Sequence, residues 1–165
     1  MSVTDAPTAI AYRRETMAEV MPSIAPLLSK HWSEIAKNRD AIPLNPDIAA
    51  YQAIESAGRL RIFTVREHGR LIGYAVYITS PRHLHYKARW AVSDIFWLSP
   101  AHRGHGLGTE LFSWIEIWLR SEGINVMHTT MKSDHPEAGA MLEGLGHTPI
   151  EVGYSKLLNP PGTEN

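Results

Sequence analysis

The 165-residue sequence contains no cysteine, and this absence excludes disulfide frameworks, thiolate zinc sites and a cysteine nucleophile. An excess of charge of one sign is also missing, because 16 Lys and Arg residues nearly balance 17 Asp and Glu residues. A net charge of −1 gives no global positive field for nucleic acid or an anionic membrane, so neither is an expected partner. No apolar run approaches the roughly 20 residues of a membrane span, and residues 1–15 lack the apolar core of a signal peptide. A soluble, cytoplasmic protein is therefore expected.

What is present is the composition of an ordinary globular domain, with 44% hydrophobic and 20% charged residues. The length suits one domain with its own core. We expect this domain to span residues 1–158, followed by a flexible tail at 159–165. Residues 1–58 would form a variable N-terminal part, a strand and two helices, and residues 59–158 the main sheet and its helices.

Hydrophobic periodicity predicts the elements of this α/β (α+β) domain. Thr16 and Glu19 have the spacing of a capping box for a helix that prolines should kink. Asn45 and Gly58 would begin and end a second helix. The remaining pattern predicts strands at 8–14, 60–66, 71–79, 90–98, 125–131 and 151–158, and helices at 107–120 and 137–145. The order β-α-α-β-β-β-α-β-α-β(-β) implies a mixed, mostly antiparallel central sheet flanked by helices.

A glycine-rich loop lies between the strand at 90–98 and the helix that begins at Leu107. Glycines at 104, 106 and 108 let the backbone approach a ligand and turn its N–H groups towards one point. The positive end of the helix and the Arg103 guanidinium favour a pyrophosphate at that point. The spacing matches neither a P-loop nor the G-x-G-x-x-G of dinucleotide sites. The alternative is a tight strand-to-helix turn without a ligand.

The loop resembles a known family. Arg103-x-x-Gly106-x-Gly108, preceded by the strand end WLSP at 97–100, is similar to the acyl-CoA loop of the GNAT (Gcn5-related) N-acetyltransferase superfamily. The likeness in element order extends from about residue 60 to residue 158. Gly73 in its strand, and a short helix that carries Ala138 and is followed by Leu145-Gly146, agree with further signatures of the family.

The resemblance implies how acetyl-CoA would bind. Backbone N–H groups from Arg103 to Thr109 would hold the pyrophosphate, and pantetheine would pair with the strand edge beside Trp97 and Leu98. The N–H group near Leu98 would stabilise the tetrahedral oxyanion. The expected acyl-CoA-binding residues are Trp97, Leu98, Arg103, Gly104, His105, Gly106, Leu107, Gly108, Thr109 and His135. The N-terminal helices would cover the cleft that binds the acceptor. Their residues His31, Trp32 and Glu34 are candidates for substrate binding, although helix packing explains Trp32 more simply.

The proton transfers are less determined. Asp94 is the first candidate for the base, or for a carboxylate that orients the amine, and a carboxylate satisfied by its neighbours is the alternative. His85 is a second candidate, since it alternates with His83 in an extended segment. In many family members a tyrosine four residues after the Ala138 position acts as the general acid, but here that position is Leu142. The leaving thiolate would then depend on water or on Tyr86, Tyr154 or His135.

Together these observations predict an N-acyltransferase that moves an acetyl or other short acyl group from acetyl-CoA to a primary amine. The acceptor would be a small molecule or a peptide. The alternative is a non-catalytic acyl-CoA-binding or regulatory protein, which Leu142 favours. Nine histidines are present, but no H-x-x-x-H pair with a supporting carboxylate predicts a metal site. Dimers are frequent in the family, so a homodimer is compatible with the resemblance, although the sequence itself does not indicate an oligomeric state.

Overall fold

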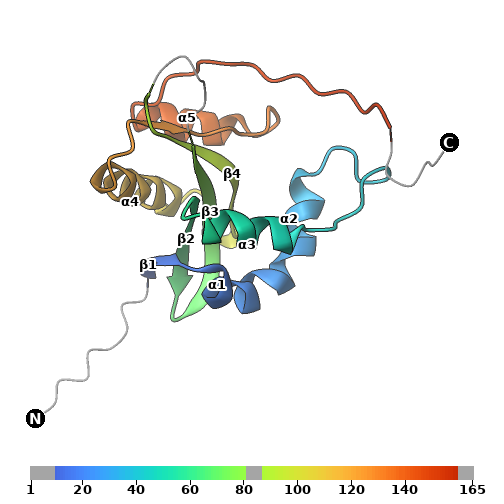
Figure 1. The fold of residues 1–165 in the computed structure, drawn as a ribbon, viewed down its shortest axis with the longest axis horizontal. Coiled ribbons are helices and arrows are strands. Elements are labelled where there is room, and N and C mark those ends of the chain that lie inside the picture. Colours follow the sequence, from blue (N-terminus) through green and yellow to red (C-terminus); the bar gives the residue numbers. More distant parts are fainter. Residues whose placement is uncertain (1–9, 81–86, 160–165) are drawn as a thin grey trace, which may run out of the picture.

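A computed structural model describes residues 10–80 and 87–159. Five strands, five α-helices and two short 3-10 helices follow one another within these residues (Figure 1). They are β1 (Ile10–Glu15), α1 (Met17–Ile24), η1 (Ala25–Leu27), α2 (Leu28–Ile35), α3 (Ile48–Ser56), β2 (Leu60–Glu67), β3 (Arg70–Ser80), β4 (Trp90–Leu98), η2 (Pro100–His102), α4 (Leu107–Ser121), β5 (Val126–His128) and α5 (Pro136–Gly144). No helix of the described part combines the length and the apolar composition needed to cross a bilayer.

Local signals set the ends of the N-terminal helices. Thr16 and Glu19 form the predicted capping box at the start of α1. Pro26 lies in η1, where the α-helical pattern is interrupted before α2, so the predicted break is confirmed. The predicted cap of α3 is wrong by two residues, because Asp47 rather than Asn45 caps it, accepting the Ala50 N–H at 2.9 Å.

The strands form one sheet in the order β1-β2-β3-β4-β5. The first three pairings are antiparallel, and the last one is parallel. β2 and β3 form a tight hairpin in which His68 and Gly69 adopt positive φ angles. This arrangement confirms the predicted fold class, a mixed, mostly antiparallel sheet with helices on its faces.

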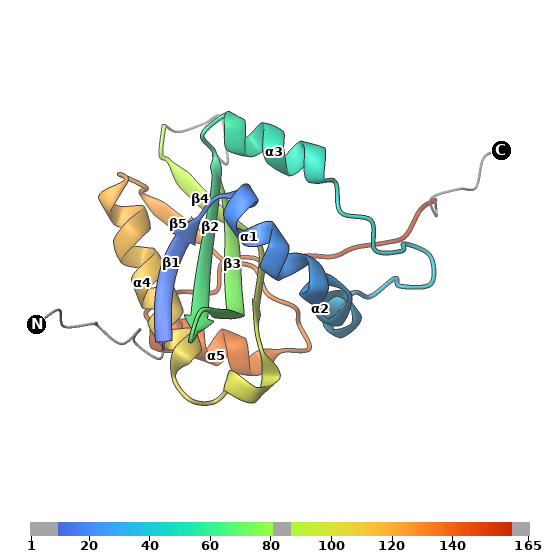
Figure 2. The same cartoon turned by 90° about the horizontal axis from the view of Figure 1, so that it is seen from below.

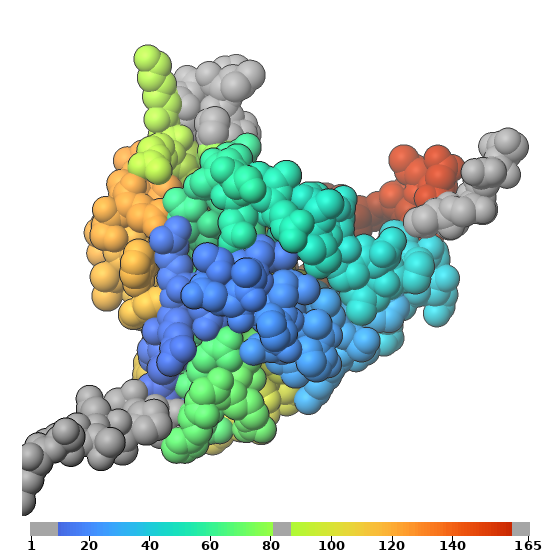
Figure 3. Space-filling view, turned by 60° about the horizontal axis from the view of Figure 1, so that its bottom comes forward, coloured from blue at the N-terminus to red at the C-terminus, as the bar shows by residue number. Residues whose placement is uncertain are grey.

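Each face of the sheet carries its own core. Helices α1, α2 and α3 pack on one face, where Ile62, Tyr74 and Trp97 are buried beneath them (Figures 2 and 3). Helices α4 and α5 pack on the other face, over Phe63 and Tyr77.

The predicted strand at 151–158 is wrong. Every residue from 151 to 159 is exposed, and the segment leads away from the sheet after α5 (Figure 1). β5 pairs with β4 through only three residues, against the seven expected at 125–131, and offers little edge for a further strand. Pro149 also removes one backbone donor near the start of the segment.

Candidate functional site

The sheet opens along one edge of β4. Its pairing with β5 runs only from Trp90 to Val92, and no described strand pairs with that edge beyond this point. On the other edge, the Ser99 N–H donates to Ile72 O of β3 at 2.7 Å. Because backbone groups alternate in direction along an antiparallel strand, the N–H groups of Phe96 and Leu98 point away from β3, to the open edge. Two backbone donors are thus available there.

Asp94 owes its position to an irregularity in the same strand. Ile95 is opposite Val76 and Ser93 is opposite Tyr77, so Asp94 is the extra residue of a bulge. Bulges re-aim side chains. The exposed Asp94 carboxylate accepts a hydrogen bond from the Tyr51 hydroxyl of α3. Burial, together with this bond, raises the pKa of Tyr51, so the phenol remains a donor at neutral pH.

The glycine-rich loop follows the end of β4 and leads into α4. Gly106 is the N-cap of α4, with φ +83°, and no side chain caps the helix there. The first N–H groups of an α-helix have no partner within the helix, and its dipole places positive charge at this end. Gly108 has a different role, because a Cβ atom there would lie 2.9 Å from Met141 Sδ of α5.

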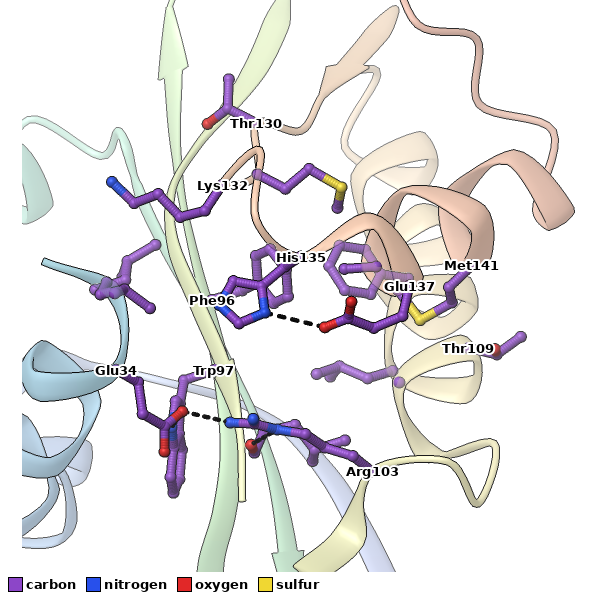
Figure 4. A pocket seen from close by; sticks show the side chains of 18 of the residues that line it. Glu34, Phe96, Trp97, Arg103, Thr109, Thr130, Lys132, His135, Glu137 and Met141 are labelled. Atoms are coloured by element: carbon purple, nitrogen blue, oxygen red, sulfur yellow. Dashed lines mark hydrogen bonds and ion pairs between the residues drawn. The ribbon is translucent and has the colours of Figure 1, made fainter. Parts of the chain in front are cut away.

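A cavity of about 660 Å³ connects these features (Figure 4). Its walls come from the end of α2, the open half of β4, the glycine loop with the first turns of α4, and the segment that leads into α5. The lining residues are Glu34, Ile35, Asp94, Ile95, Phe96, Trp97, Leu98, Arg103, Gly104, Gly106, Gly108, Thr109, Leu111, Phe112, Thr130, Met131, Lys132, His135, Glu137, Ala138 and Met141.

The α2 wall carries a polar cluster. Arg103 Nη2 donates to Glu34 Oε2 at 2.6 Å, and Trp97 Nε1 donates to the same oxygen at 3.3 Å. Burial opposes ionisation of Glu34, but the bond to Arg103 and its charge outweigh it and hold the pKa of Glu34 below its usual range. His31, only 1% exposed, shares a hydrogen bond with Tyr74. Burial lowers the pKa of His31 to about 4, so this imidazole is neutral at pH 7.

The opposite wall combines the predicted His135 with polar groups that the sequence did not indicate. His135 Nδ1 bonds to Glu137 Oε1 at 3.0 Å at the start of α5 (Figure 4). Lys132 points into the same cavity from the preceding segment. The adjacent Asp134 pairs with Lys37, which follows α2. Their positions depend on how β5 ends, a feature without a local sequence signal.

The predicted site residues fall into three groups. Most of the residues expected to bind acyl-CoA, His135 included, line the cavity, and so do Asp94 and Glu34. His31, Trp32, His105 and Leu107 lie close by in sequence but do not line it. Tyr154 is 94% exposed on the C-terminal segment, away from the cavity, and His85 and Tyr86 lie outside the described residues. Leu142 is 6% exposed and packs in the core, so it presents nothing to the cavity.

Among the described residues, no group of three His, Asp or Glu side chains is placed to hold an ion. Two carboxylates of the cavity are engaged in pairs, Glu34 with Arg103 and Glu137 with His135. The site offers backbone donors, a helix N-terminus and the exposed carboxylates of Asp94 and Glu137.

Comparison with known proteins agrees with this geometry. The model of the Acetyltransferase (GNAT) family matches residues 24–147. No protein of curated function matches the sequence. Among solved structures, an aminoglycoside acetyltransferase, meta-AAC0020, from an uncultured soil metagenomic sample in complex with sisomicin has a TM-score of 0.70 at 11% identity, over 92% of this chain and 97% of its own.

Two further structures are similar over their whole length. The ribosomal-protein-alanine N-acetyltransferase from Brucella melitensis biovar Abortus 2308 has a TM-score of 0.68 at 14% identity, over 92% of this chain and 100% of its own. AAC(6')-Iy, in complex with the bisubstrate analog CoA-S-monomethyl-acetylneamine, has a TM-score of 0.63 at 17% identity with the same coverage. At these identities the likeness concerns the fold.

Proposed function

Since the chain belongs to the acetyltransferase (GNAT) family, we propose that it transfers an acetyl or other short acyl group from acyl-CoA to a primary amine. One observation carries this proposal. The open edge of β4 and the uncapped N-terminus of α4 line the same cavity, joined by the glycine loop. A ligand that combines amide groups with a pyrophosphate matches these two features, because amides pair with a strand edge and a pyrophosphate binds a helix N-terminus.

In this proposal the pyrophosphate of acyl-CoA binds the N–H groups between Gly104 and Thr109. The pantetheine amides pair with the β4 edge, where Phe96 and Leu98 offer their N–H groups. One of these donors then faces the thioester oxygen and stabilises the oxyanion that forms on attack. The acyl carbon would lie on the Asp94 side of the cavity.

The acceptor amine must be neutral when it attacks the thioester carbon. Asp94 would accept a proton from the amine, and the Tyr51 hydroxyl would hold the carboxylate in place. The new C–N bond gives a tetrahedral intermediate, whose collapse breaks the C–S bond and releases the CoA thiolate. Acceptors named for the similar structures are aminoglycosides and a ribosomal protein, so a small molecule or a peptide is compatible with the fold.

A second candidate is an acyl-CoA-binding regulator without catalysis. The observation that favours it is Leu142, which is buried in the core where many relatives have a general acid. One similar structure is a transcriptional regulator from Bacillus halodurans C-125. This candidate shares the ligand of the first but predicts no thiol release with any amine.

Calorimetric titration with acetyl-CoA, against ATP and NAD, tests the shared premise. We expect selective binding of acetyl-CoA by the wild type and loss of binding in Gly106→Trp. Gly69→Trp is a matched control, because Gly69 has nearly the same φ, +82°, and equally open surroundings but lies at the β2–β3 hairpin. No binding to the wild type, or equal loss in both variants, would refute the loop assignment. Thiol release with an amine panel then separates the enzyme from the regulator.

A further inference from the structure

The Arg103 side chain lies across the cavity instead of facing the mouth of the glycine loop. Its Nη2 group donates to Glu34 at 2.6 Å, and its Nε group donates to Leu98 O at 2.8 Å (Figure 4). The first bond joins the loop before α4 to helix α2. The second occupies a backbone acceptor on the open edge of β4. One guanidinium therefore fills two positions inside the proposed acyl-CoA and acceptor sites.

These two bonds compete with ligand binding. A pantetheine N–H that donates to the β4 edge at Leu98 would compete with Arg103 for the Leu98 carbonyl oxygen. A phosphate at the α4 N-terminus would attract the same guanidinium, since Arg binds phosphate and carboxylate oxygens with similar geometry. Arg103 cannot satisfy the ligand and Glu34 at once. Acyl-CoA binding should consequently break the Arg103–Glu34 pair.

Glu34 would then need another cation. Its side chain is only 24% exposed and also accepts the Trp97 N–H, so losing Arg103 would leave a partly buried carboxylate without a counter-charge. The neighbouring His31 is neutral at pH 7 and supplies no charge. Lys37, three residues further along the chain, already pairs with Asp134. Lys132 lines the same cavity, but the charges that act on the Glu34 carboxylate are those of Arg103 and His31. The charge that replaces Arg103 should therefore come from the acceptor.

We propose that Arg103 occupies the position at Glu34 that a cationic group of the acceptor takes after acyl-CoA has bound. Acyl-CoA would move Arg103 away from Glu34, and Glu34 could then bind an amine that carries a second positive charge. This inference rests on the proposed function. Glu34 and Asp94 line the same cavity, so one could hold the second cation while the other receives the proton of the reacting amine. The acceptor class is then a diamine or a longer cationic amine, which binds after acyl-CoA.

Acetyl-CoA affinity tests the competition without any acceptor. Glu34→Gln should bind acetyl-CoA about three-fold more tightly, because the partly exposed ion pair no longer opposes withdrawal of Arg103. Glu137→Gln is the matched control, since it removes the same charge from the same cavity but from a carboxylate that bonds to His135. In an Arg103→Gln background, Glu34→Gln should bring no gain beyond that control. Equal gains from Glu34→Gln and Glu137→Gln, or an unchanged gain in that background, would overturn the inference.

Acceptor choice provides an independent test. Thiol release is measured with α,ω-diamines of three to six carbons and with monoamines of matched length. The wild type should favour one or more diamines at least ten-fold in kcat/KM, and Glu34→Gln should erase that preference through KM. If the wild type binds acetyl-CoA but uses diamines and monoamines equally, the proposed acceptor class is refuted and the proposed function stands. Failure of the wild type to bind acetyl-CoA would overturn both.

Discussion

Replacing Gly108 with alanine is expected to strain the contact between α4 and α5. A Cβ atom at this position would lie 2.9 Å from Met141 Sδ, closer than real contacts allow. Gly106, two residues earlier, has no atom within 4 Å of its Cβ position but has φ +83°. Alanine there should cost free energy through the backbone alone. The two glycines of one motif therefore predict two different kinds of destabilisation.

The magnitudes are similar, so a single variant cannot distinguish them. Overpacking costs about 1–3 kcal/mol in general, and the lower part of this range, about 1–2 kcal/mol, applies at Gly108 because the flexible Met141 side chain can shift. Replacing a helical glycine offsets about 0.5–1 kcal/mol of this cost. The left-handed conformation costs alanine at Gly106 about 1–2 kcal/mol. Shortening Met141 to alanine removes the crowding at Gly108 but leaves the Gly106 backbone unaffected. The interaction free energy with Met141→Ala should be about 1–2 kcal/mol for Gly108→Ala and within about 0.5 kcal/mol of zero for Gly106→Ala.

Urea unfolding followed by tryptophan fluorescence measures both cycles on six proteins. These are the wild type, the three single variants and the two double variants with Met141→Ala. Equal interaction free energies in the two cycles would refute the reasoning, as would a value near zero for Gly108→Ala. A calorimetric titration of the same proteins adds a functional readout, in which Gly106→Ala should weaken acetyl-CoA binding even when Met141 is shortened.

Three further outcomes follow from the structure. Asp94→Asn should lower turnover by about 10²–10⁴ with acetyl-CoA affinity unchanged, as thiol release and calorimetry would show; undiminished turnover would assign the base elsewhere. Glu15→Gln leaves the buried Arg66 guanidinium without its bidentate carboxylate and should lower the free energy of unfolding in urea by about 3–5 kcal/mol. Glu67→Gln at the hairpin should lower it by less than about 1 kcal/mol, and equal losses in the two variants would contradict the prediction. Burial lowers the pKa of His31 to about 4, below the value of about 6.5 in the unfolded state. The free energy of unfolding should therefore reach its full value above pH 6.5 and fall by on the order of 3 kcal/mol as the pH decreases towards 4, because only the unfolded state takes up the proton. Parallel pH profiles for the wild type and His31→Gln would refute this.

The sequence predicted those features that local signals determine. The bounds of β4 at 90–98 agree with its apolar and β-branched pattern, and α4 begins at the predicted Leu107, directly after the glycines. The Thr16 capping box agrees for the same reason, since both partners lie within four residues. Each of these depends on neighbours along the chain, which a sequence displays directly.

Features that depend on distant partners were not predictable in the same way. The bulge at Asp94 follows from the register of β3, and the Tyr51 hydrogen bond joins residues 43 positions apart. The Arg103–Glu34 pair spans 69 positions, so the sequence assigned each residue to a different ligand and missed their competition. The period-2 pattern at 151–158 failed as a strand prediction for a related reason, because alternation does not reveal whether a neighbouring edge is long enough.

The position of Leu142 constrains how the thiolate can leave. Ala138 and Met141 line the cavity from α5, whereas Leu142 packs into the core formed with α4. A tyrosine at residue 142 would thus have to overfill this core or turn the helix before its hydroxyl could reach the cavity. The thiolate does not need such a donor, because thiols titrate near pH 8.5 and the anion is a fair leaving group near neutrality. In the proposed reaction Asp94 accepts the proton of the amine and backbone donors at the β4 edge stabilise the oxyanion, while the departing thiolate takes its proton from solvent or from His135, which lines the same cavity.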